Sequence, residues 1–246
     1  MLIITADDLG LDKQVTDRIL SSFSMQRISS ASAMVFMKDT MRAAESAAEL
    51  NLEVGLHLNF TLPFSASNVS SKLKAHQNAI SSYLLSSKFG QLIYNPFLRD
   101  SFYFVFRAQQ EEFYRLYGKN PNFYNGHHHM HLCSNIILSN LLPRQVPVRR
   151  TFTFNWGEKD PLDILYRRIL DHFINYRYIS TDYFYSLSAL MELETLQKFI
   201  TLSRIKNVEI MVHPNRDREF IYIQSNEYFK LLNLTKVGNF KEITRT

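Results

Sequence analysis

Residues 53–61 read EVGLHLNFT, and this stretch decides the fold class of the chain. Apolar residues alternate along it with small or polar ones, in the order Glu53, Val54, Gly55, Leu56, His57, Leu58, Asn59, Phe60 and Thr61. A period of two predicts a β-strand with one apolar face. That face can pack against helices, whereas the opposite face carries a histidine, an amide and a hydroxyl. These groups need polar surroundings, which the mouth of a barrel provides.

Other short apolar runs predict further strands, and helical patterns separate most of them. With the first, the predicted strands are Leu2–Thr5, Ser32–Phe36, Glu53–Thr61, Asn122–His128, Val146–Thr151, Tyr178–Thr181 and Val208–His213. The predicted helices include residues 13–28, 39–50, 134–142, 162–173 and 191–203. Alternating β and α elements favour a parallel sheet, either closed as a barrel or open. We find no repeat and no second domain, and expect one domain over residues 1–246.

One segment interrupts the alternation of strands and helices. Residues 63–100 are rich in Ser, Asn and Lys, and we expect a variable insertion that is partly helical. The aromatic segment Phe102–Phe106 follows and leads into a helix that ends near Gly118. We interpret this segment as a buried helix start or a dimer contact rather than a membrane attachment.

Composition narrows the function classes. Apolar residues make up 46% of the chain and charged residues 21%, which is ordinary for a globular protein. The net charge is +5, but Lys and Arg form no run of five, so a basic enzyme surface is favoured over nucleic-acid binding. Cys133 is the single cysteine, which excludes a disulfide framework and a thiolate metal cage. The N-terminus is too acidic for a signal peptide and no apolar run spans a bilayer, so we expect a cytoplasmic protein.

Histidine and aspartate gather at the ends of predicted strands. Asp7 and Asp8 follow the first strand, His57 lies on the third, residues 127–131 read HHHMH after the fourth, and His213 ends the last. The carboxyl ends of parallel strands form one rim, where active sites of α/β folds are built. Each feature alone has a purely structural explanation, such as a turn, a helix cap or a hydrogen-bonded core histidine. Their convergence on one rim favours a metal site.

The chemistry of these groups indicates hydrolysis. One Asp and two His hold a divalent ion and leave positions open for water and substrate. Two adjacent aspartates can share a site only where the strand breaks, and one can then bind the ion while the other takes a proton from water. Such an ion lowers the pKa of water from about 15.7 towards about 7 in the strongest zinc cases. His213 is placed to protonate a leaving amine.

Five ordered motifs resemble the YdjC-like carbohydrate deacetylases, of which chitooligosaccharide deacetylase is typical. They read ADDLG, SSASAMVF, GLHLNFT, GKNPNFYNGHHHMH and EIMVHP. The resemblance implies a distorted (β/α) barrel of about seven parallel strands, similar to a TIM barrel. It extends from Ile4 to about Leu231, with residues 63–100 matching poorly.

The resemblance also implies roles for individual residues. Asp7 becomes the general base and His213 the catalytic acid, while Asp8, His57 and His127 bind one metal ion, usually magnesium in the family and zinc in related deacetylases. Further residues would contact the substrate or orient the ligands: Asn125, His129, His131, Arg150 and Asp182. Asn125 stands where members commonly carry aspartate, which would weaken orientation of a ligand or alter the metal preference.

The sequence therefore predicts a cytoplasmic, metal-dependent hydrolase of carbohydrate metabolism that removes the acetyl group from an N-acetylated sugar or oligosaccharide. The expected partners are the saccharide and a second copy in a homodimer, with no nucleic acid and no transmembrane segment. One alternative is a deacylase of the same family that acts on a lipid-linked or envelope-precursor substrate, which the aromatic segment Phe102–Phe106 and the basic pI of about 9.2 would suit. Another is a relative that binds metal or sugar without turnover.

Overall fold

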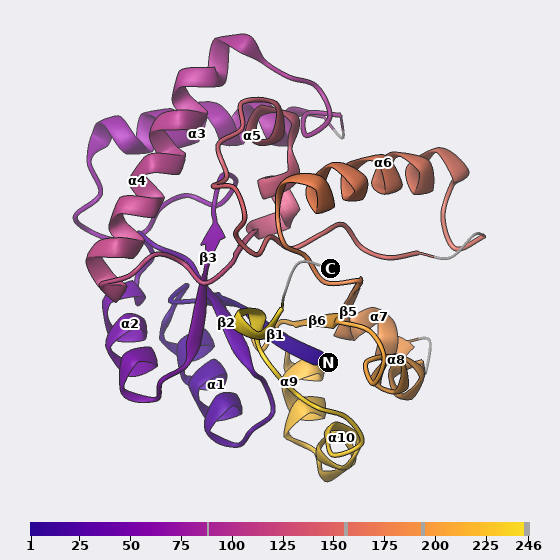
Figure 1. Cartoon of the computed structure of the whole chain (residues 1–246). Helices are drawn as coiled ribbons and strands as arrows, with labels where there is room; N and C mark the ends of the chain where they lie inside the picture. Colours follow the sequence, from indigo (N-terminus) through magenta and orange to yellow (C-terminus); the bar gives the residue numbers. More distant parts are fainter. Residues whose placement is uncertain (88, 155–156, 193–194, 244–246) are drawn as a thin grey trace. The chain divides into compact units, whose positions relative to one another are not determined.

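The computed structural model describes residues 1–87, 89–154, 157–192 and 195–243 (Figure 1). The strands are β1 (Leu2–Leu9), β2 (Ser30–Ala33), β3 (Glu53–Leu58), β4 (Tyr124–Gly126), β5 (Tyr183–Ser186) and β6 (Val208–Val212). The helices are α1 (Lys13–Ser24), α2 (Thr40–Glu49), α3 (Ser71–Ser86), α4 (Arg99–Tyr117), α5 (Ser134–Leu138), α6 (Pro161–Arg177), α7 (Leu187–Glu192), α8 (Leu196–Leu202), α9 (Asp217–Gln224) and α10 (Asn226–Leu232). Short 3₁₀ helices cover Pro96–Leu98 (η1), His127–Leu132 (η2) and Phe240–Glu242 (η3).

The chain forms two compact units. The first unit comprises Met1–Asp7, Arg18–Ala31 and Arg144–Thr246, and the second comprises Asp8–Asp17 and Ser32–Pro143. The strands are ordered β4-β3-β2-β1-β6-β5, and β1 pairs with β6, β5 with β6 and β3 with β4, each in parallel. The fold class is therefore α/β, with a parallel sheet, as the sequence predicts.

Six strands are found in the described residues where seven were predicted, and closure into a barrel is not confirmed. The predicted strand Val146–Thr151 is an extended segment with a single bridge, from Pro147 to Ile179. The two hydrogen bonds of this bridge run from the Val148 N–H to the Ile179 carbonyl and from the Ile179 N–H to the Val146 carbonyl, which is too short a pairing to make a strand. The predicted strand Tyr178–Thr181 is also wrong in position, because the strand begins at Tyr183. The predicted helix 191–203 appears as α7 and α8, and its residues 193–194 lie outside the described residues.

In the second unit, the predicted insertion forms a helix that packs onto the rest of the unit. α3 begins after Ser70, whose hydroxyl accepts a hydrogen bond from the Leu73 N–H. α3 packs against α4, and α4 packs against β3. Phe102 and Phe106 of α4 are buried, and the Phe102 ring lies 5.5 Å from that of Phe60. The aromatic segment is therefore the buried helix start that was one of its two interpretations.

Close backbone contact fixes β3 within this unit. A Cβ atom on Gly55 would lie 2.6 Å from the ring and from the carbonyl oxygen of Phe123, so only glycine fits there. Without that side chain, β3 and the chain entering β4 approach closely, and His57 on β3 pairs in register with Asn125 on β4.

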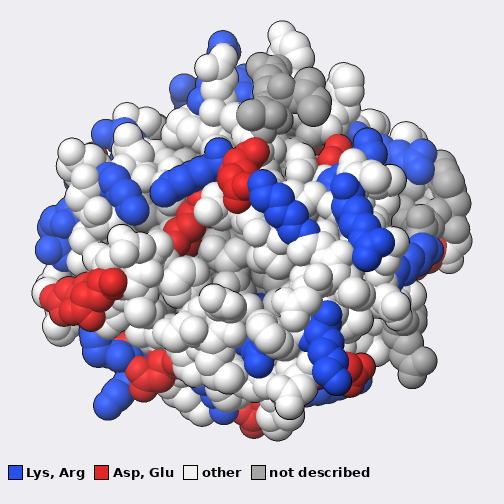
Figure 2. All heavy atoms as spheres, turned by 60° about the horizontal axis from the view of Figure 1, so that its bottom comes forward, with Lys and Arg blue, Asp and Glu red and all other residues white. Residues whose placement is uncertain are grey.

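The surface is mixed in charge. On the face shown in Figure 2, Lys and Arg side chains are interspersed with Asp and Glu. No helix among the described residues is long and apolar enough to cross a bilayer.

Candidate metal centre

Three predicted ligands meet in the second unit. Asp8, His57 and His127 offer one donor atom each, and these atoms all lie within 4.8 Å of one another. Oδ1 of Asp8 lies 3.2 Å from Nε2 of His57 and 3.1 Å from Nδ1 of His127. Asp8 and His57 are almost fully buried, and His127 retains some exposure. The sequence predicted that these residues, from three distant segments of the chain, would meet at one place, and the structure confirms that they do.

The spacing and chemistry of this donor set fit a divalent cation. Two ligands at about 2.1 Å from one ion, and at right angles, lie about 3 Å apart, close to the separations seen here. By ligand softness, the two imidazoles favour zinc, whereas the carboxylate oxygen is accepted by both zinc and magnesium. Three protein ligands also leave coordination positions for water and substrate. These residues could therefore hold the metal.

Backbone conformation brings the Asp8 side chain to this site. Its φ is 71°, in the left-handed region that non-glycine residues rarely adopt, although aspartate tolerates it better than most. The regular extended backbone of β1 is interrupted at this residue. Uncommon backbone angles of this kind cluster at functional sites.

The histidine cluster is shaped by a sharp turn after β4. His128 and His129 both have positive φ, 53° and 59°, within η2. A Cβ on Gly126 would lie 3.0 Å from the backbone nitrogen of His131, so the turn folds tightly over the end of the strand. His127 points to Asp8, and His131 at the end of this turn is fully buried.

The remaining cluster histidines make contacts within the cluster. The His129 ring lies 6.3 Å from the His131 ring. His128, which the sequence prediction passed over, has its ring 4.1 Å from that of His127 and its Nδ1 3.2 Å from Oγ1 of Thr61. Adjacency to His127 was the only signal that could have found it.

Two polar groups hold the His57 ring. Its Nδ1 lies 2.8 Å from Oδ1 of Asn125 and 3.1 Å from Oγ of Ser32. When Nε2 of His57 binds a metal ion, the proton of the ring lies on Nδ1, and the amide oxygen of Asn125 can accept it. Asn125 was expected to affect the orientation of a ligand, and the proposed ligand that it contacts is His57. The reason is the parallel register, which places Asn125 directly beside His57.

Electrostatics keep Asp8 ionised. Burial by itself raises the pKa of the Asp8 carboxyl, but hydrogen bonds from His127 and His57 outweigh burial and hold that pKa well below its usual range. A charged carboxylate beside two imidazoles is the form that binds a cation.

A second charged cluster lies in the first unit. Both carboxylate oxygens of Asp7 accept hydrogen bonds from Arg149, at 2.6 and 2.9 Å, and Arg149 also donates to Glu209 at 2.8 Å. All three side chains are buried. Burial by itself lowers the pKa of Arg149, but the two carboxylates raise it. Burial also raises the pKa of Glu209, although Arg149 opposes this.

The sequence prediction missed Arg149 and chose its neighbour. Arg150 donates to Asp171 of α6 at 2.6 Å and to the backbone carbonyls of Thr181 and Asp182. Asp182 precedes β5, and its Oδ2 accepts a hydrogen bond from the Asn207 N–H at 2.8 Å. Nothing in the sequence distinguishes two consecutive arginines, and only the fold decides which one meets Asp7.

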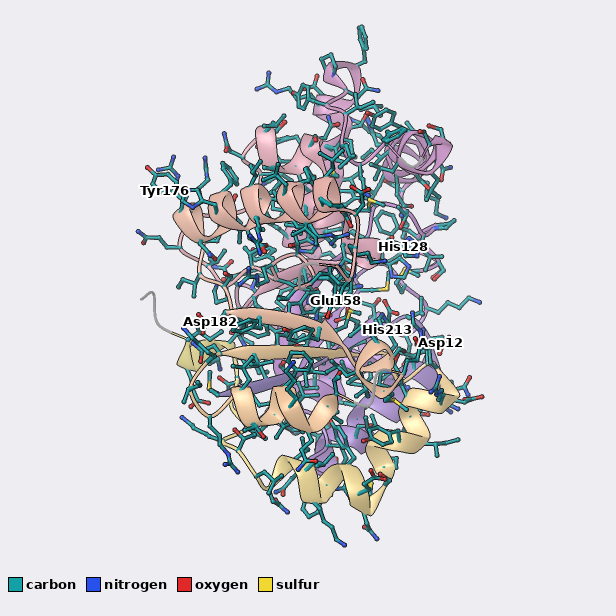
Figure 3. All side chains as sticks on the ribbon, turned by 90° about the vertical axis from the view of Figure 1, so that its right-hand side faces the viewer. Asp12, His128, Glu158, Tyr176, Asp182 and His213 are labelled. Atoms are coloured by element: carbon teal, nitrogen blue, oxygen red, sulfur yellow. The ribbon has the colours of Figure 1, made fainter. Side chains whose placement is uncertain are left out.

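His213 follows β6 in the first unit. Its backbone N–H donates to Oε2 of Glu219 at 2.7 Å, and Glu219 is almost fully buried. In Figure 3, His213 and Asp182 lie at opposite ends of the β5–β6 pair. This agrees with parallel pairing, because His213 follows one strand and Asp182 precedes the other. Asp182 is therefore not at the strand end that carries His213.

Comparison with known proteins identifies the family of this chain. The family described as YdjC-like protein matches residues 1–240. A carbohydrate deacetylase of Clostridium beijerinckii is 26% identical over 98% of this chain and 92% of its own length. A chitooligosaccharide deacetylase of Yersinia pestis is 28% identical, over 55% of this chain and 52% of its own length, so the match spans about half of that relative.

One solved structure shares the fold. A crystal structure from Enterococcus faecalis V583, provisionally described as a cellobiose-phosphate cleavage protein, has a TM-score of 0.73 with 19% identity, and the match covers 98% of this chain and 97% of that one. The family match over nearly the whole length settles the classification. This chain belongs to the YdjC-like protein family.

Proposed function

We propose that this chain is a metal-dependent hydrolase that removes the acetyl group from an N-acetylated sugar or oligosaccharide. The observation that carries the proposal is the convergence of Asp8, His57 and His127, whose donor atoms lie within 4.8 Å of one another. The carbohydrate deacetylase named above, 26% identical over 92% of its own length, supports the choice of reaction and substrate class.

Asp8, His57 and His127 would hold one divalent ion, magnesium by the family resemblance and zinc as the alternative. Such an ion would lower the pKa of a water molecule and polarise an acyl carbonyl. His57 is oriented for this task by Asn125 and Ser32, and Asp8 is kept ionised by both imidazoles.

Asp7 is the proposed general base and is the chain neighbour of Asp8. Arg149 fixes the orientation of its carboxylate, and each carboxylate oxygen keeps a further lone pair with which to accept a proton from water. Breaking the amide bond leaves an amine that needs a proton, and His213 is the proposed donor. The Glu219 carboxylate holds the backbone of His213. Acetate and a free amino sugar are the products.

Acetate release from N-acetylated chitooligosaccharides tests the proposal, with bound metal measured in parallel. Asp7→Asn should abolish turnover and leave the metal content unchanged, whereas His127→Ala should lose both. Normal turnover by the Asp7 variant would remove its assigned role. A wild-type protein that binds metal and sugar but releases no acetate would instead be the non-catalytic alternative.

The lipid-linked alternative keeps the basic pI of about 9.2 in its favour. Its other support is weaker, because Phe102 and Phe106 of the aromatic segment are buried in α4. Comparing acetate release from chitooligosaccharides with release from lipid-linked sugars would separate the two substrates.

A further inference from the structure

In the second unit, α3 and α4 are joined by a connection that lies beside α5 (Figure 1). The end of α3 and this connection carry exposed apolar side chains. Leu85, Phe89, Leu92, Ile93 and Phe97 are 59, 50, 39, 59 and 93% exposed. We call these five residues the apolar tip. Exposed apolar residues are common singly, but a cluster of large ones in one short segment marks an interaction surface.

Contacts with α3 and α5 hold the backbone of this connection in place. The Tyr83 hydroxyl of α3 donates to the Ile93 carbonyl at 2.6 Å. The Asn135 side chain of α5 accepts from the Asn95 N–H at 3.0 Å and donates to the Asn95 carbonyl at 2.8 Å. Gly90 packs against the end of α3, since a Cβ there would lie 2.8 Å from the Tyr83 carbonyl oxygen. The apolar side chains are therefore presented by a backbone whose polar groups have partners, and such a surface can enter an apolar medium at lower cost.

The sequence around the apolar tip is basic. Residues 63–99 contain no aspartate or glutamate but have four basic residues, Lys72, Lys74, Lys88 and Arg99. Arg99 is exposed and begins α4 two residues after Phe97. Apolar side chains next to positive charge match a bilayer that contains anionic lipids, because the apolar groups enter the interface and the basic groups bind lipid phosphates. The same charge disfavours a second copy of this chain as the partner, since its net charge is also +5.

We propose that the apolar tip inserts into the interface of an anionic lipid bilayer and holds this chain at a membrane surface. Phenylalanine, leucine and isoleucine side chains enter the boundary between lipid headgroups and acyl chains. Arg99 then lies at the level of the lipid phosphates, which carry the opposite charge. This attachment is to one surface of the bilayer and needs no spanning helix.

Contacts on two sides connect the apolar tip to the metal centre within the same unit. The Ser81 hydroxyl of α3 donates to the Thr61 carbonyl at 2.8 Å, and Oγ1 of Thr61 lies 3.2 Å from Nδ1 of His128, the chain neighbour of a proposed ligand. The Ser134 hydroxyl, at the start of α5, donates to the Leu92 carbonyl at 2.6 Å. Docking through the tip therefore holds the proposed metal ligands beside the membrane.

Sedimentation of the full chain with lipid vesicles tests the docking. We expect binding to vesicles made of equal parts of phosphatidylcholine and phosphatidylglycerol, and much weaker binding to phosphatidylcholine alone. Phe97→Asp and Ile93→Asp should each lower the partition onto the mixed vesicles at least about tenfold, because each removes a large apolar group and adds a charge of the same sign as the lipid. Ile205→Asp is the matched control, because Ile205 is 79% exposed but lies in the first unit, and it should bind as the wild type does.

Two outcomes would overturn the proposal. One is a wild-type chain that stays in solution with both lipid compositions, which is the result expected if an acidic protein covers the tip instead. The other is a pair of tip variants that bind the mixed vesicles as well as the wild type does.

Charge reversal provides a second test that keeps the apolar contact. Arg99→Glu should weaken binding to the mixed vesicles about tenfold, and the fold should tolerate it because a carboxylate suits the first turn of α4. Lys119→Glu, beyond the other end of α4, reverses the same charge away from the tip and should have a much smaller effect. Equal effects of the two variants would contradict docking through the tip. Vesicle binding requires neither metal nor turnover, so this test and that of the deacetylase proposal can fail independently.

Discussion

Oδ1 of Asn125 lies 2.8 Å from Nδ1 of His57, so a neutral amide holds the ring of a proposed metal ligand. Where a carboxylate would increase the electron density on the imidazole, the amide only fixes the tautomer and the orientation. Metal affinity should therefore respond to this one contact.

Asn125→Ala should weaken metal binding about 10- to 100-fold, because His57 loses the acceptor that fixes its tautomer. Asn125→Asp should bind at least as tightly as the wild type, since a carboxylate accepts the same bond. Isothermal titration with zinc and with magnesium measures both changes. An unchanged affinity in Asn125→Ala would show that Ser32 alone holds the ring.

Adding metal should stabilise the wild-type protein against unfolding. Binding to the folded state alone contributes about 2.7 kcal/mol at a free metal concentration of 100 times Kd. Thermal denaturation with metal and with a chelator measures this difference. His127→Ala should show no such shift, whereas His76→Ala, a variant of a histidine that bonds Ser101 instead, should keep it. Equal shifts in both variants would place the metal elsewhere.

Arg149→Met should destabilise the fold by about 3–5 kcal/mol, because Asp7 and Glu209 would be left as buried carboxylates without their cation. Urea denaturation gives the free energy of unfolding. The control is Arg115→Met, which removes an ion pair with Glu112 in which the arginine side chain is 53% exposed and which should cost no more than about 1 kcal/mol. A similar loss of unfolding free energy in the two variants would mean that the buried cluster of Asp7, Arg149 and Glu209 contributes no more to stability than a surface ion pair.

Glu219→Gln should lower amide hydrolysis far more than hydrolysis of an activated acetyl ester. The leaving group of such an ester needs no proton. The rate of ester hydrolysis therefore depends on metal binding and on the general base, but not on proton donation by His213. Asp217→Asn, on the same turn of α9 but with a side chain 76% exposed, should alter neither rate. This prediction rests on the proposed role of His213. Equal losses on amide and ester would mean that Glu219 serves the fold alone.

Cys133 should resist thiol reagents in the native protein. Burial raises the pKa of its thiol from 9.0 to about 12. Because the folded-state pKa lies above the unfolded one, the thiol contributes stability that is fully present below about pH 9 and is lost as the pH rises towards 12. A chromogenic disulfide should react with one thiol only after denaturation at pH 8. Rapid reaction of the native protein would contradict the burial.

Local chemistry explains what could be predicted from the sequence. The alternation in Glu53–Leu58 follows from the geometry of a single strand, so β3 and its polar face were predictable. Aspartate and histidine at strand ends indicated a metal site, because few other structures require that combination. Asp8, His57 and His127 were thus identified before their contacts were known, and those contacts confirm that they meet.

Only the tertiary structure decided features that depend on which segments meet. Parallel register placed Asn125 on His57 rather than His127, and packing selected Arg149 over Arg150 as the partner of Asp7. The predicted strand Val146–Thr151 forms only the bridge from Pro147 to Ile179, because pairing depends on a second segment that its own pattern does not contain. Periodicity likewise marks the apolar face of a helix but not which way that face points. The sequence determined which groups could bind a metal. Long-range packing determined the partners of those groups, because a contact joins two segments and the pattern of one segment does not show which other segment it meets.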